Sequence, residues 1–367
     1  MSTIVQIGED CEKAKRRPVL CFDVVIVTRN RPEALELSIP LILTQSRQPE
    51  RLIVIDSSDD HAPVADAVAR LTRDWGGEVY VEHCEKGLCY QRNIGMAYVM
   101  ADVVVFPDDD SLFFPGALEA IMAAYERDTD QAIVGVCAAE AIRPPEGAGL
   151  KDAYQMSREH IVEAQTRLWR NRLEKRVQAL KPVLFLGQTL AARHDAPDWL
   201  DAQNCVVVEY MTGFRMSFRS DAIKAVGFDE TLREYGLEED VDASLSVARA
   251  GLLVGARDAK VYHHRFPGGR GDPRMLGAIQ ILNRIYVVLK HAAAGAMPSR
   301  DAARARRRLS AFILIKLVAG LPGLRHQSGR ERFAGAWAAS RMGRRLWRDT
   351  PEALSAGYEQ AMNRIKL

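Results

Sequence analysis

Three adjacent aspartates, Asp108, Asp109 and Asp110, follow the apolar run V-V-V-F-P at residues 103–107. Like charges at this spacing repel one another and are costly to bury without compensation. Two carboxylates on a turn provide the oxygen ligands that Mg²⁺ and Mn²⁺ prefer, and a bound cation would neutralise the repulsion. Because side chains two positions apart in an extended segment point the same way, we expect Asp108 and Asp110 to face the site and Asp109 to point away. A solvated acidic turn is the alternative, although the preceding apolar run weighs against it.

Two other clusters have residue types suited to catalysis or metal binding. Glu239 and Asp240 follow Glu238 at the start of a predicted helix, where free backbone N–H groups keep a carboxylate ionised. An ionised carboxylate suits a general base, and plain helix capping is the alternative. His263 and His264 precede a glycine-rich loop, and one neutral imidazole there would complete a metal site. The alternative is a surface histidine pair at a strand end.

The first part of the chain alternates between predicted strands and helices. Apolar, β-branched runs predict buried strands at residues 21–28, 51–56, 78–82 and 103–106, with helical stretches at 33–46, from 64, and at 87–100. This alternation favours a mostly parallel sheet with helices on both faces. Polar residues gather just after the strands: Thr28, Arg29, Asn30, Asp56 and Asp108 to Asp110. In open α/β sheets this edge is where ligands bind, so we expect these side chains to share one site.

The rest of the chain predicts an insert, further α/β elements and a helical end. We expect a lead-in at 1–20, an α/β domain at 21–272 with an insert at about 140–205, and a basic helical region at 273–367. Within these parts the patterns predict a charged helix near 157–180, a strand at 206–220, a helix at 237–251, and two short strands, L-L-V-G and A-K-V-Y.

Composition indicates the class of protein and its cellular compartment. At 367 residues, the chain exceeds what one hydrophobic core usually supports, and its 47% apolar and 27% charged residues are ordinary for a globular protein. The six cysteines form no C-x-x-C pair, so we expect reduced thiols. The first residues lack the apolar segment of a signal peptide. Together these features predict a cytoplasmic protein.

The net charge of +2 conceals an uneven distribution. Residues 300–348 hold 13 Lys or Arg against two acids, which makes this segment +11 and leaves −9 on the remainder. Its arginines alternate with apolar residues at helical spacing, so we expect no nucleic-acid partner. Two interpretations stay open. One is an interfacial helix on anionic lipid at the inner face of a membrane; the other is a basic bundle packed on the body or on another subunit of a homo-oligomer.

Seven motifs together resemble a known enzyme family. F-D-V-V-I-V-T-R-N-R-P, L-I-V-I-D-S-S, G-L-C-Y-Q-R-N-I-G and V-V-V-F-P-D-D-D resemble the nucleotide-binding half of family 2 glycosyltransferases, which have the GT-A fold. M-T-G-F-R-M-S-F-R-S, G-F-D-E-T-L and G-L-E-E-D-V-D-A-S-L-S-V-A-R-A-G resemble the acceptor half, and the likeness spans about residues 21–272 in the family's order. Pro107 and the histidine doublet depart from the usual pattern.

The resemblance implies a role for each matching residue. The nucleotide pocket would be made of Thr28, Arg29, Asn30, Asp56, Arg92, Asn93, Asp108 and Asp109. The general base would be Asp240, with Glu239 beside it. The metal site would be made of Asp108, Asp110 and either His263 or His264. Asp56 would recognise a pyrimidine base, and Asp108 would approach the ribose as well as the metal.

The implied reaction is an inverting, Mn²⁺- or Mg²⁺-dependent transfer of a sugar from a nucleoside-diphosphate sugar, of the UDP or dTDP type. The acceptor hydroxyl would belong to a glycan, a lipid-linked acceptor or a small molecule. A non-catalytic sugar-nucleotide-binding relative is an alternative of a different class and would have lost the base or the metal site. A sugar nucleotidyltransferase would need a glycine-rich phosphate loop after the first strand, where T-R-N-R-P-E stands.

Overall fold

The computed structural model describes residues 19–148, 150, 181–232, 236–266, 272–293 and 297–366. The first half alternates strand and helix as predicted. Its elements are β1 Phe22–Thr28, α1 Pro32–Leu43, β2 Arg51–Asp56, α2 Ala62–Leu71, β3 Glu78–His83, α3 Leu88–Tyr98, β4 Val103–Phe106, β5 Ser111–Phe113, α4 Ala117–Arg127 and β6 Ile133–Glu140. The second half of the body contains α6 Pro182–Ala191, β7 Cys205–Val207, β8 Met216–Arg219, α7 Ser220–Val226, α8 Glu239–Val247 and β9 Leu252–His263.

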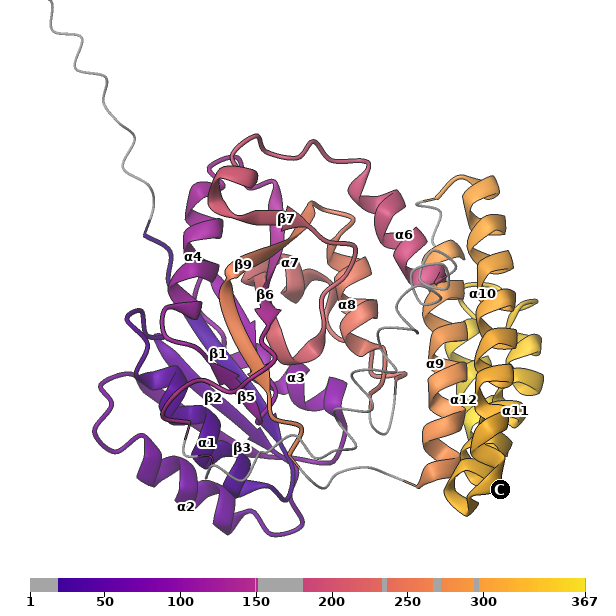
Figure 1. Ribbon diagram of the computed structural model, residues 1–367, viewed down its shortest axis with the longest axis horizontal. Coiled ribbons are helices and arrows are strands. Elements are labelled where there is room, and N and C mark those ends of the chain that lie inside the picture. Colours follow the sequence, from indigo (N-terminus) through magenta and orange to yellow (C-terminus); the bar gives the residue numbers. More distant parts are fainter. Residues whose placement is uncertain are drawn as a thin grey trace, which may run out of the picture.

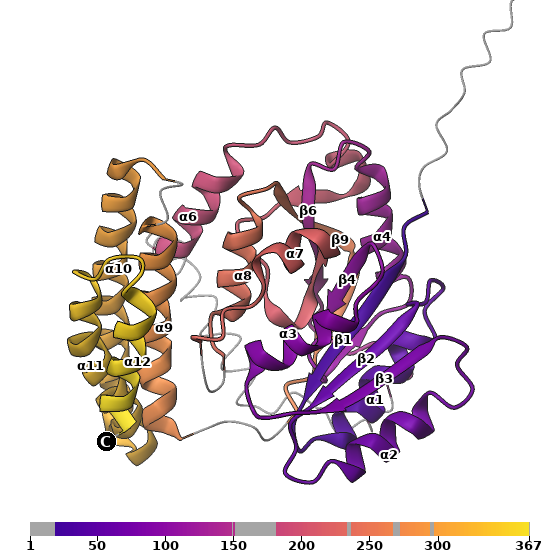
Figure 2. The same cartoon turned by 180° about the vertical axis from the view of Figure 1, so that it is seen from behind.

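A single mixed sheet of nine strands forms the centre of the body, in the order β3-β2-β1-β4-β8-β6-β9-β5, with β7 pairing with β9. Strands β1 to β4 pair in parallel, whereas β8 runs antiparallel to both β4 and β6. Helices α1 and α2 lie in front of the sheet in Figure 1, and α3 lies in front of it when the molecule is seen from behind in Figure 2. The predicted mostly parallel sheet with helices on both faces is confirmed.

Two predicted strand boundaries are wrong. Residues 206–220 do not form one strand, because β7 pairs with β9 whereas β8 lies between β4 and β6. The segment between β7 and β8 must therefore pass from β9 to the position between β4 and β6. It turns through a 3₁₀ helix at Gly213–Arg215. The two short strands predicted as L-L-V-G and A-K-V-Y are one strand, β9, with an irregularity where it pairs with β6. The predicted helix near 157–180 lies outside the described residues.

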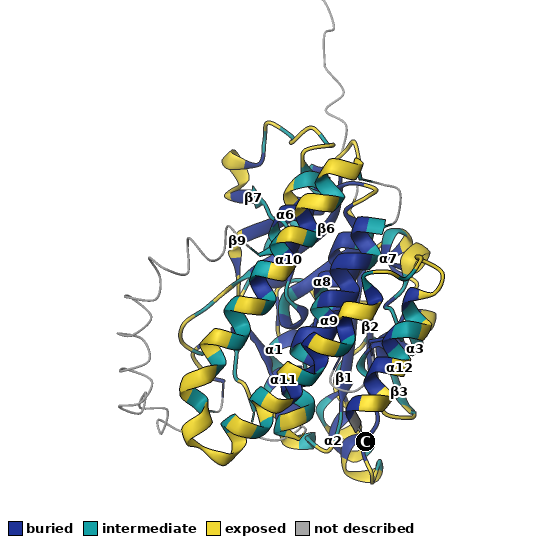
Figure 3. Ribbon diagram, turned by 90° about the vertical axis from the view of Figure 1, so that its right-hand side faces the viewer, coloured by how far each residue is buried: buried dark blue, intermediate teal, exposed yellow. Residues whose placement is uncertain are grey.

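The C-terminal region is helical, as predicted. It contains α9 Pro273–Ala293, α10 Ser299–Gly320, the 3₁₀ helix η3 Leu321–Arg325, α11 Gln327–Leu346 and α12 Leu354–Lys366. These helices stand side by side along one side of the body (Figure 1), and α10 presents many exposed residues to solvent (Figure 3). None of the described helices combines the length and apolar character needed to cross a bilayer. The five described cysteines are free thiols.

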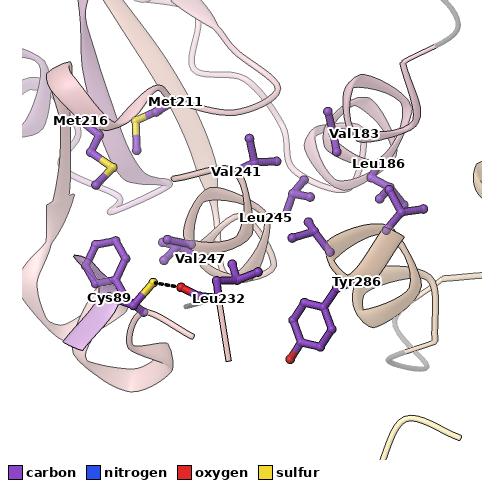
Figure 4. Packing of buried hydrophobic residues seen from close by; sticks show 14 of the residues in the cluster. Cys89, Val183, Leu186, Met211, Met216, Leu232, Val241, Leu245, Val247 and Tyr286 are labelled. Atoms are coloured by element: carbon purple, nitrogen blue, oxygen red, sulfur yellow. Dashed lines mark hydrogen bonds between the residues drawn. The ribbon is translucent and has the colours of Figure 1, made fainter. Parts of the chain in front are cut away.

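The helical region shares a hydrophobic core with the body. Val241 and Leu245 of α8 face Val183 of α6 and Tyr286 of α9 (Figure 4), and all four belong to one buried cluster. A second cluster, on the opposite face of the sheet, packs α1, α2 and α4 against the strands. The helices that follow residue 272 therefore complete the covering of the α3 and α8 side.

Two glycines let α9 and α11 approach very closely. A Cβ atom at Gly335 would lie 1.8 Å from the backbone oxygen of Arg274, and one at Gly277 would lie 1.9 Å from the backbone oxygen of Arg332. Both contacts are with backbone, which cannot move aside as a flexible side chain can. The two helices can therefore keep their spacing only with glycine at these positions.

We predict that Gly335→Ala lowers the thermal unfolding midpoint. Alanine is favoured over glycine in a helix interior by about 1 kcal/mol, so propensity alone would raise stability. Forcing α9 and α11 apart should outweigh that gain, because overpacking in a dense core costs about 1–3 kcal/mol. Differential scanning calorimetry measures the change. The control is Gly76→Ala, where a Cβ would meet no atom within 4 Å. An unchanged or raised midpoint for Gly335→Ala would contradict the close packing.

Candidate active site

A cavity of about 830 Å³ lies at the carboxyl ends of β1 and β4. One wall comes from the sheet edge and includes Thr28, Asp108 and Asp109. Another comes from the start of α8, with Glu239 and Asp240, and α9 and α12 of the helical region close it. The predicted ligand edge of the sheet is therefore the floor of a cavity to which the C-terminal helices contribute.

The loop after β4 turns sharply, which sets the direction of each aspartate. An isolated bridge between Val27 and Asp108 ends the extended segment, and the Ser111 backbone N–H then donates to the Asp108 carbonyl. The chain is therefore already turning at Asp109. Its side chain is fully buried rather than pointing away as expected: it accepts a hydrogen bond from the Thr28 hydroxyl at 2.7 Å.

Arg31 compensates the buried charge in this loop. Its guanidinium lies 2.7 Å from Asp109 and 3.8 Å from Asp110. Burial raises the pKa of Asp109 to about 7, although Arg31 and the Thr28 hydrogen bond lower it in part. The sequence analysis did not select Arg31. The signal was present, because the residue stands in the T-R-N-R-P turn after the first strand.

Asp108, Asp110 and His263 form a compact group of candidate metal ligands. One ligand atom from each lies within 4.8 Å of the others, and His263 Nε2 is 3.3 Å from an Asp110 oxygen. The pairing of β5 with β9 produces this arrangement, because it sets Ser111 opposite His263. The imidazole stacks on the Phe214 ring with centroids 4.5 Å apart, which fixes its plane.

The donor set of this group fits a divalent cation of the Mn²⁺ type. Two carboxylates suit Mg²⁺ or Mn²⁺, and the imidazole adds a nitrogen ligand more typical of transition metals. Burial opposes ionisation of Asp110, yet the hydrogen bond and charge of His263 bring its pKa below the ordinary value. His264 points elsewhere: its ring lies among Tyr262 and Phe266, and it does not belong to the group.

The candidate base lies at the start of α8. Glu238 adopts a left-handed φ of 79° immediately before the helix, so the predicted helix start at 237 moves to Glu239. Asp240 accepts hydrogen bonds from the Gly213 N–H at 2.9 Å and from the Val241 N–H at 2.7 Å. Burial and the charge of Glu238 raise its pKa to about 6, although these two N–H groups lower it in part. Asp240 is therefore held in place by backbone donors.

Arg92 joins the acidic loop to the base helix. This side chain is only 1% exposed, and its guanidinium lies 2.6 Å from Glu239 and 3.2 Å from Asp108. Burial and the charge of Asp240 raise the pKa of Glu239, while the Arg92 charge and hydrogen bond lower it. The described residues that line the cavity do not include Arg92. Glu239 is therefore engaged in a structural ion pair, whereas no cation of the described residues pairs with Asp240.

Helix α9 holds α8 and the chain before it through a row of polar contacts. Lys290 Nζ lies 2.6 Å from Asp229 and 2.7 Å from Asp242, and His291 Nε2 lies 2.9 Å from Asp242. Nearer the site, Arg284 pairs with Glu238 at 2.5 Å. The helical region thus fixes both the first turn of α8 and the residue that precedes it.

The other predicted nucleotide-site residues surround the cavity at different depths. Arg29 lines it, and both Arg29 and Asn30 hydrogen-bond to Asp59. Asp56 is fully buried and accepts hydrogen bonds from the backbone N–H and hydroxyl of Ser58, while His61 Nδ1 lies 2.8 Å from its second oxygen. The structure therefore brings Arg29 to the cavity and places Asp56 beneath the turn that borders it.

Asn93 lies away from the cavity. Its amide donates to the Phe228 carbonyl and to Glu230, and its oxygen accepts from the Phe228 N–H. This residue fixes the chain after α7. Several other cavity residues were missed by the sequence analysis, because single cations and aromatics leave no pattern there: Lys86, Phe214, Arg265 and Arg274 line the cavity.

Comparison with known proteins supports the arrangement of the fold. The sequence profile of the glycosyl transferase family 2 matches residues 23–187. A solved structure described as mannosyltransferase PcManGT from Pyrobaculum calidifontis, in complex with GDP-Man and Mn²⁺, superposes with a TM-score of 0.51 at 14% identity, covering 95% of this chain and 87% of that one. A structure of GalNAc-T7 with UDP, GalNAc and Mn²⁺ gives a TM-score of 0.45 at 12% identity, covering 79% and 54%. No curated protein matches the chain.

The profile match covers the strands and helices that carry the acidic loop, and the similar structure extends over nearly the whole chain. The motifs and the mixed sheet agree with both. Residues 23–187 therefore match the glycosyl transferase family 2, and the chain has the GT-A fold.

Proposed function

We propose that this protein is an inverting, metal-dependent glycosyltransferase that uses a nucleoside-diphosphate sugar. The observation that carries the proposal is the arrangement across one cavity: Asp108, Asp110 and His263 form a ligand group on one side, and Asp240 stands on the other. Arg92 connects the two sides through Asp108 and Glu239.

The charges along the cavity support a diphosphate donor. Besides the carboxylates, five cationic side chains line it among the described residues: Arg29, Arg31, Lys86, Arg265 and Arg274. A nucleoside diphosphate carries several negative charges and would pair with such groups and with the cation. We propose UDP or dTDP as the nucleotide, with Asp56 shaping the base pocket through the turn at Ser57 and Ser58. Ser57 lines the cavity and Asp56 accepts from Ser58.

Asp240 supplies the base in this mechanism. Its carboxylate takes the proton of the acceptor hydroxyl as that oxygen attacks the anomeric carbon. When bound, a divalent cation would act as a Lewis acid on the leaving diphosphate. A single displacement inverts the anomeric configuration. Glu239, the carboxylate next to Asp240 in the sequence, is paired with Arg92, and a retaining mechanism would need a free carboxylate as nucleophile.

The acceptor side of the cavity is partly apolar. Leu88 and Leu237 from the body, Met275, Leu276 and Ile279 of α9, and Ile365 of α12 border it. An acceptor with an apolar portion would bury it here, whereas a small polar acceptor would leave this wall in contact with water. We propose an acceptor carried by a lipid over a free glycan.

We predict that Asp240→Asn and Asp110→Asn separate chemistry from binding. Asp240→Asn should lower kcat by about 10²–10⁴-fold, because it removes the base, and should keep Mn²⁺-dependent binding of UDP or dTDP. Asp110→Asn should lose both. Transfer is measured with the donor sugar, and binding by thermal shift with nucleotide plus or minus Mn²⁺.

Asp130→Asn is the matched control, because Asp130 is exposed and distant from the cavity lining. Full transfer by Asp240→Asn would remove the base assignment. Binding of no nucleotide by the wild-type protein would contradict the proposed donor class.

We predict that kcat/KM falls as the pH drops through about 6 at saturating Mn²⁺. Asp240 must be ionised to accept a proton, and its pKa is raised to about 6 by burial and by Glu238. Glu238→Gln removes that second cause, so the acidic limb should move to lower pH. Mn²⁺ affinity, measured separately at each pH, keeps metal loss apart from base protonation. A limb that does not move in Glu238→Gln would contradict the assignment.

We predict that His263→Gln weakens Mn²⁺ binding by about tenfold or more, since even partners of ligands cost 10–100-fold. His264→Gln should change it by less than about twofold, because this ring is outside the ligand group. Mn²⁺-dependent thermal stabilisation measures both variants. Equal losses in the two variants would mean that the doublet acts as a pair.

A further inference from the structure

The outer surface of the helical region has a cluster of exposed apolar residues. Five of the eleven exposed large apolar residues among the described part of the chain fall within residues 314–337. They are Leu314 at 63% exposed, Val318 at 56%, Leu321 at 48%, Leu324 at 36% and Trp337 at 50%. Exposed leucines are common singly, whereas a gathering on neighbouring helices is not.

These residues form one continuous stripe. Leu314, Val318 and Leu321 are spaced four and three residues apart, which places them on one face of α10 and its continuation into η3. The stripe crosses to α11 through Phe333. This ring lies against Gly320, where a Cβ atom would be 3.1 Å from it, and it stacks on Trp337 with centroids 6.4 Å apart. We call Leu314, Val318, Leu321, Leu324, Phe333 and Trp337 the apolar stripe.

Arginines flank the apolar stripe on α11. Arg330, Arg341 and Arg344 lie seven residues before, and four and seven residues after, Trp337, so all four share one helix face. All three arginines are exposed. Among the described residues no ion pair involves them, and the only acid of α11, Glu331, accepts a hydrogen bond from Gln327. The face of α11 is therefore apolar around Phe333 and Trp337 and positive on both sides of them along the helix.

We infer that this face binds the surface of a bilayer containing anionic lipids. Apolar burial combined with arginine attraction is how an interfacial helix binds anionic lipid, and tryptophan is favoured at the membrane interface. Because the stripe runs along the outer faces of α10 and α11, the contact would lie along the surface of the bilayer. The segment 300–348 carries +11, which complements a negative membrane.

A second copy of this chain fits the face less well. In a two-fold contact the same surface meets itself, so burying the apolar stripe would bring Arg330, Arg341 and Arg344 toward the arginines of the other copy. The described part of α11 offers only Glu331 to offset them. Like charges at a buried contact are unfavourable, whereas lipid phosphates would neutralise them.

Membrane binding would bring the cavity to the bilayer. The helical region presents α10 and α11 outward, whereas α9 and α12 supply Met275, Ile279 and Ile365 to the cavity wall. A lipid-borne acceptor would then be held within one layer of helices of Asp240. This last step rests on the proposed glycosyl transfer; binding to lipid does not.

Flotation of the whole chain with vesicles tests the inference without any donor or acceptor. We expect the wild type to float with vesicles of phosphatidylcholine and phosphatidylglycerol, to stay behind with phosphatidylcholine alone, and to detach at high salt. Leu314→Ser with Val318→Ser and Trp337→Ser should lose binding by about tenfold or more, and so should Arg330→Gln with Arg341→Gln and Arg344→Gln.

Matched controls alter the same chemistry elsewhere. Met100→Ser with Ile142→Ser removes exposed apolar residues, and Arg73→Gln with Arg143→Gln and Arg257→Gln removes three exposed arginines of the body. Both controls should float like the wild type, and circular dichroism should find all variants folded.

Three outcomes would overturn the inference. They are a wild type that never floats with anionic vesicles, stripe variants that float unchanged, and controls that lose binding equally. Sedimentation in the absence of lipid tests whether a second copy of the chain binds this face instead. If the wild type does not float and is a dimer, and the stripe variants are monomers, the face is a subunit interface. Because flotation needs no catalysis, an inactive enzyme that still floats would separate this inference from the proposed function.

Discussion

The buried guanidinium of Arg92 is the contact on which the rest of the cavity depends. Asp108 and Glu239 come from opposite halves of the body, and both would be left beside other acids if Arg92 were absent. A carboxylate without a partner in such a place is costly, and an arginine pairs two carboxylates with fixed geometry. Arg92 therefore sets the separation between the acidic loop and the start of α8. The remaining groups of the cavity are arranged around that separation.

Helix α9 plays the corresponding part on the other side of α8. Its contacts with Asp229, Glu238 and Asp242 fix a helix whose own first turn is crowded with acids. Buried ion pairs contribute less to stability than their number suggests, and their best-supported role is to specify one arrangement over others. The helical region is therefore part of the framework that orients the base, in addition to its contribution to the cavity wall.

Local patterns in the sequence predicted the framework well, because they report what a segment buries. β-branched runs located β1, β2 and β4, and the placement of Asp108 to Asp110 after such a run predicted an acidic edge. The sequence could not predict which partner each acid would meet. The contact of Arg92 with Glu239 spans 147 positions, and the register that sets Ser111 opposite His263 comes from a strand pairing that no local pattern encodes. Asp109 was misjudged for a related reason, since the turn begins one residue earlier than an extended segment would allow.

The cavity takes its walls from residues as far apart as Val27 and Ile365. During synthesis the amino-terminal strands emerge first, and domains generally fold as units while the chain is still growing. The acidic loop would then leave the ribosome long before α8, β9 and α12 are available to surround it. Until those elements have been synthesised, the apolar side of α3 stays exposed. The acidic loop of the nascent chain then lacks the groups that surround it in the folded protein. Folding of this protein should therefore depend strongly on the time between synthesis of its sheet and of its last helices, a constraint on translation rate and chaperone assistance rather than on chemistry.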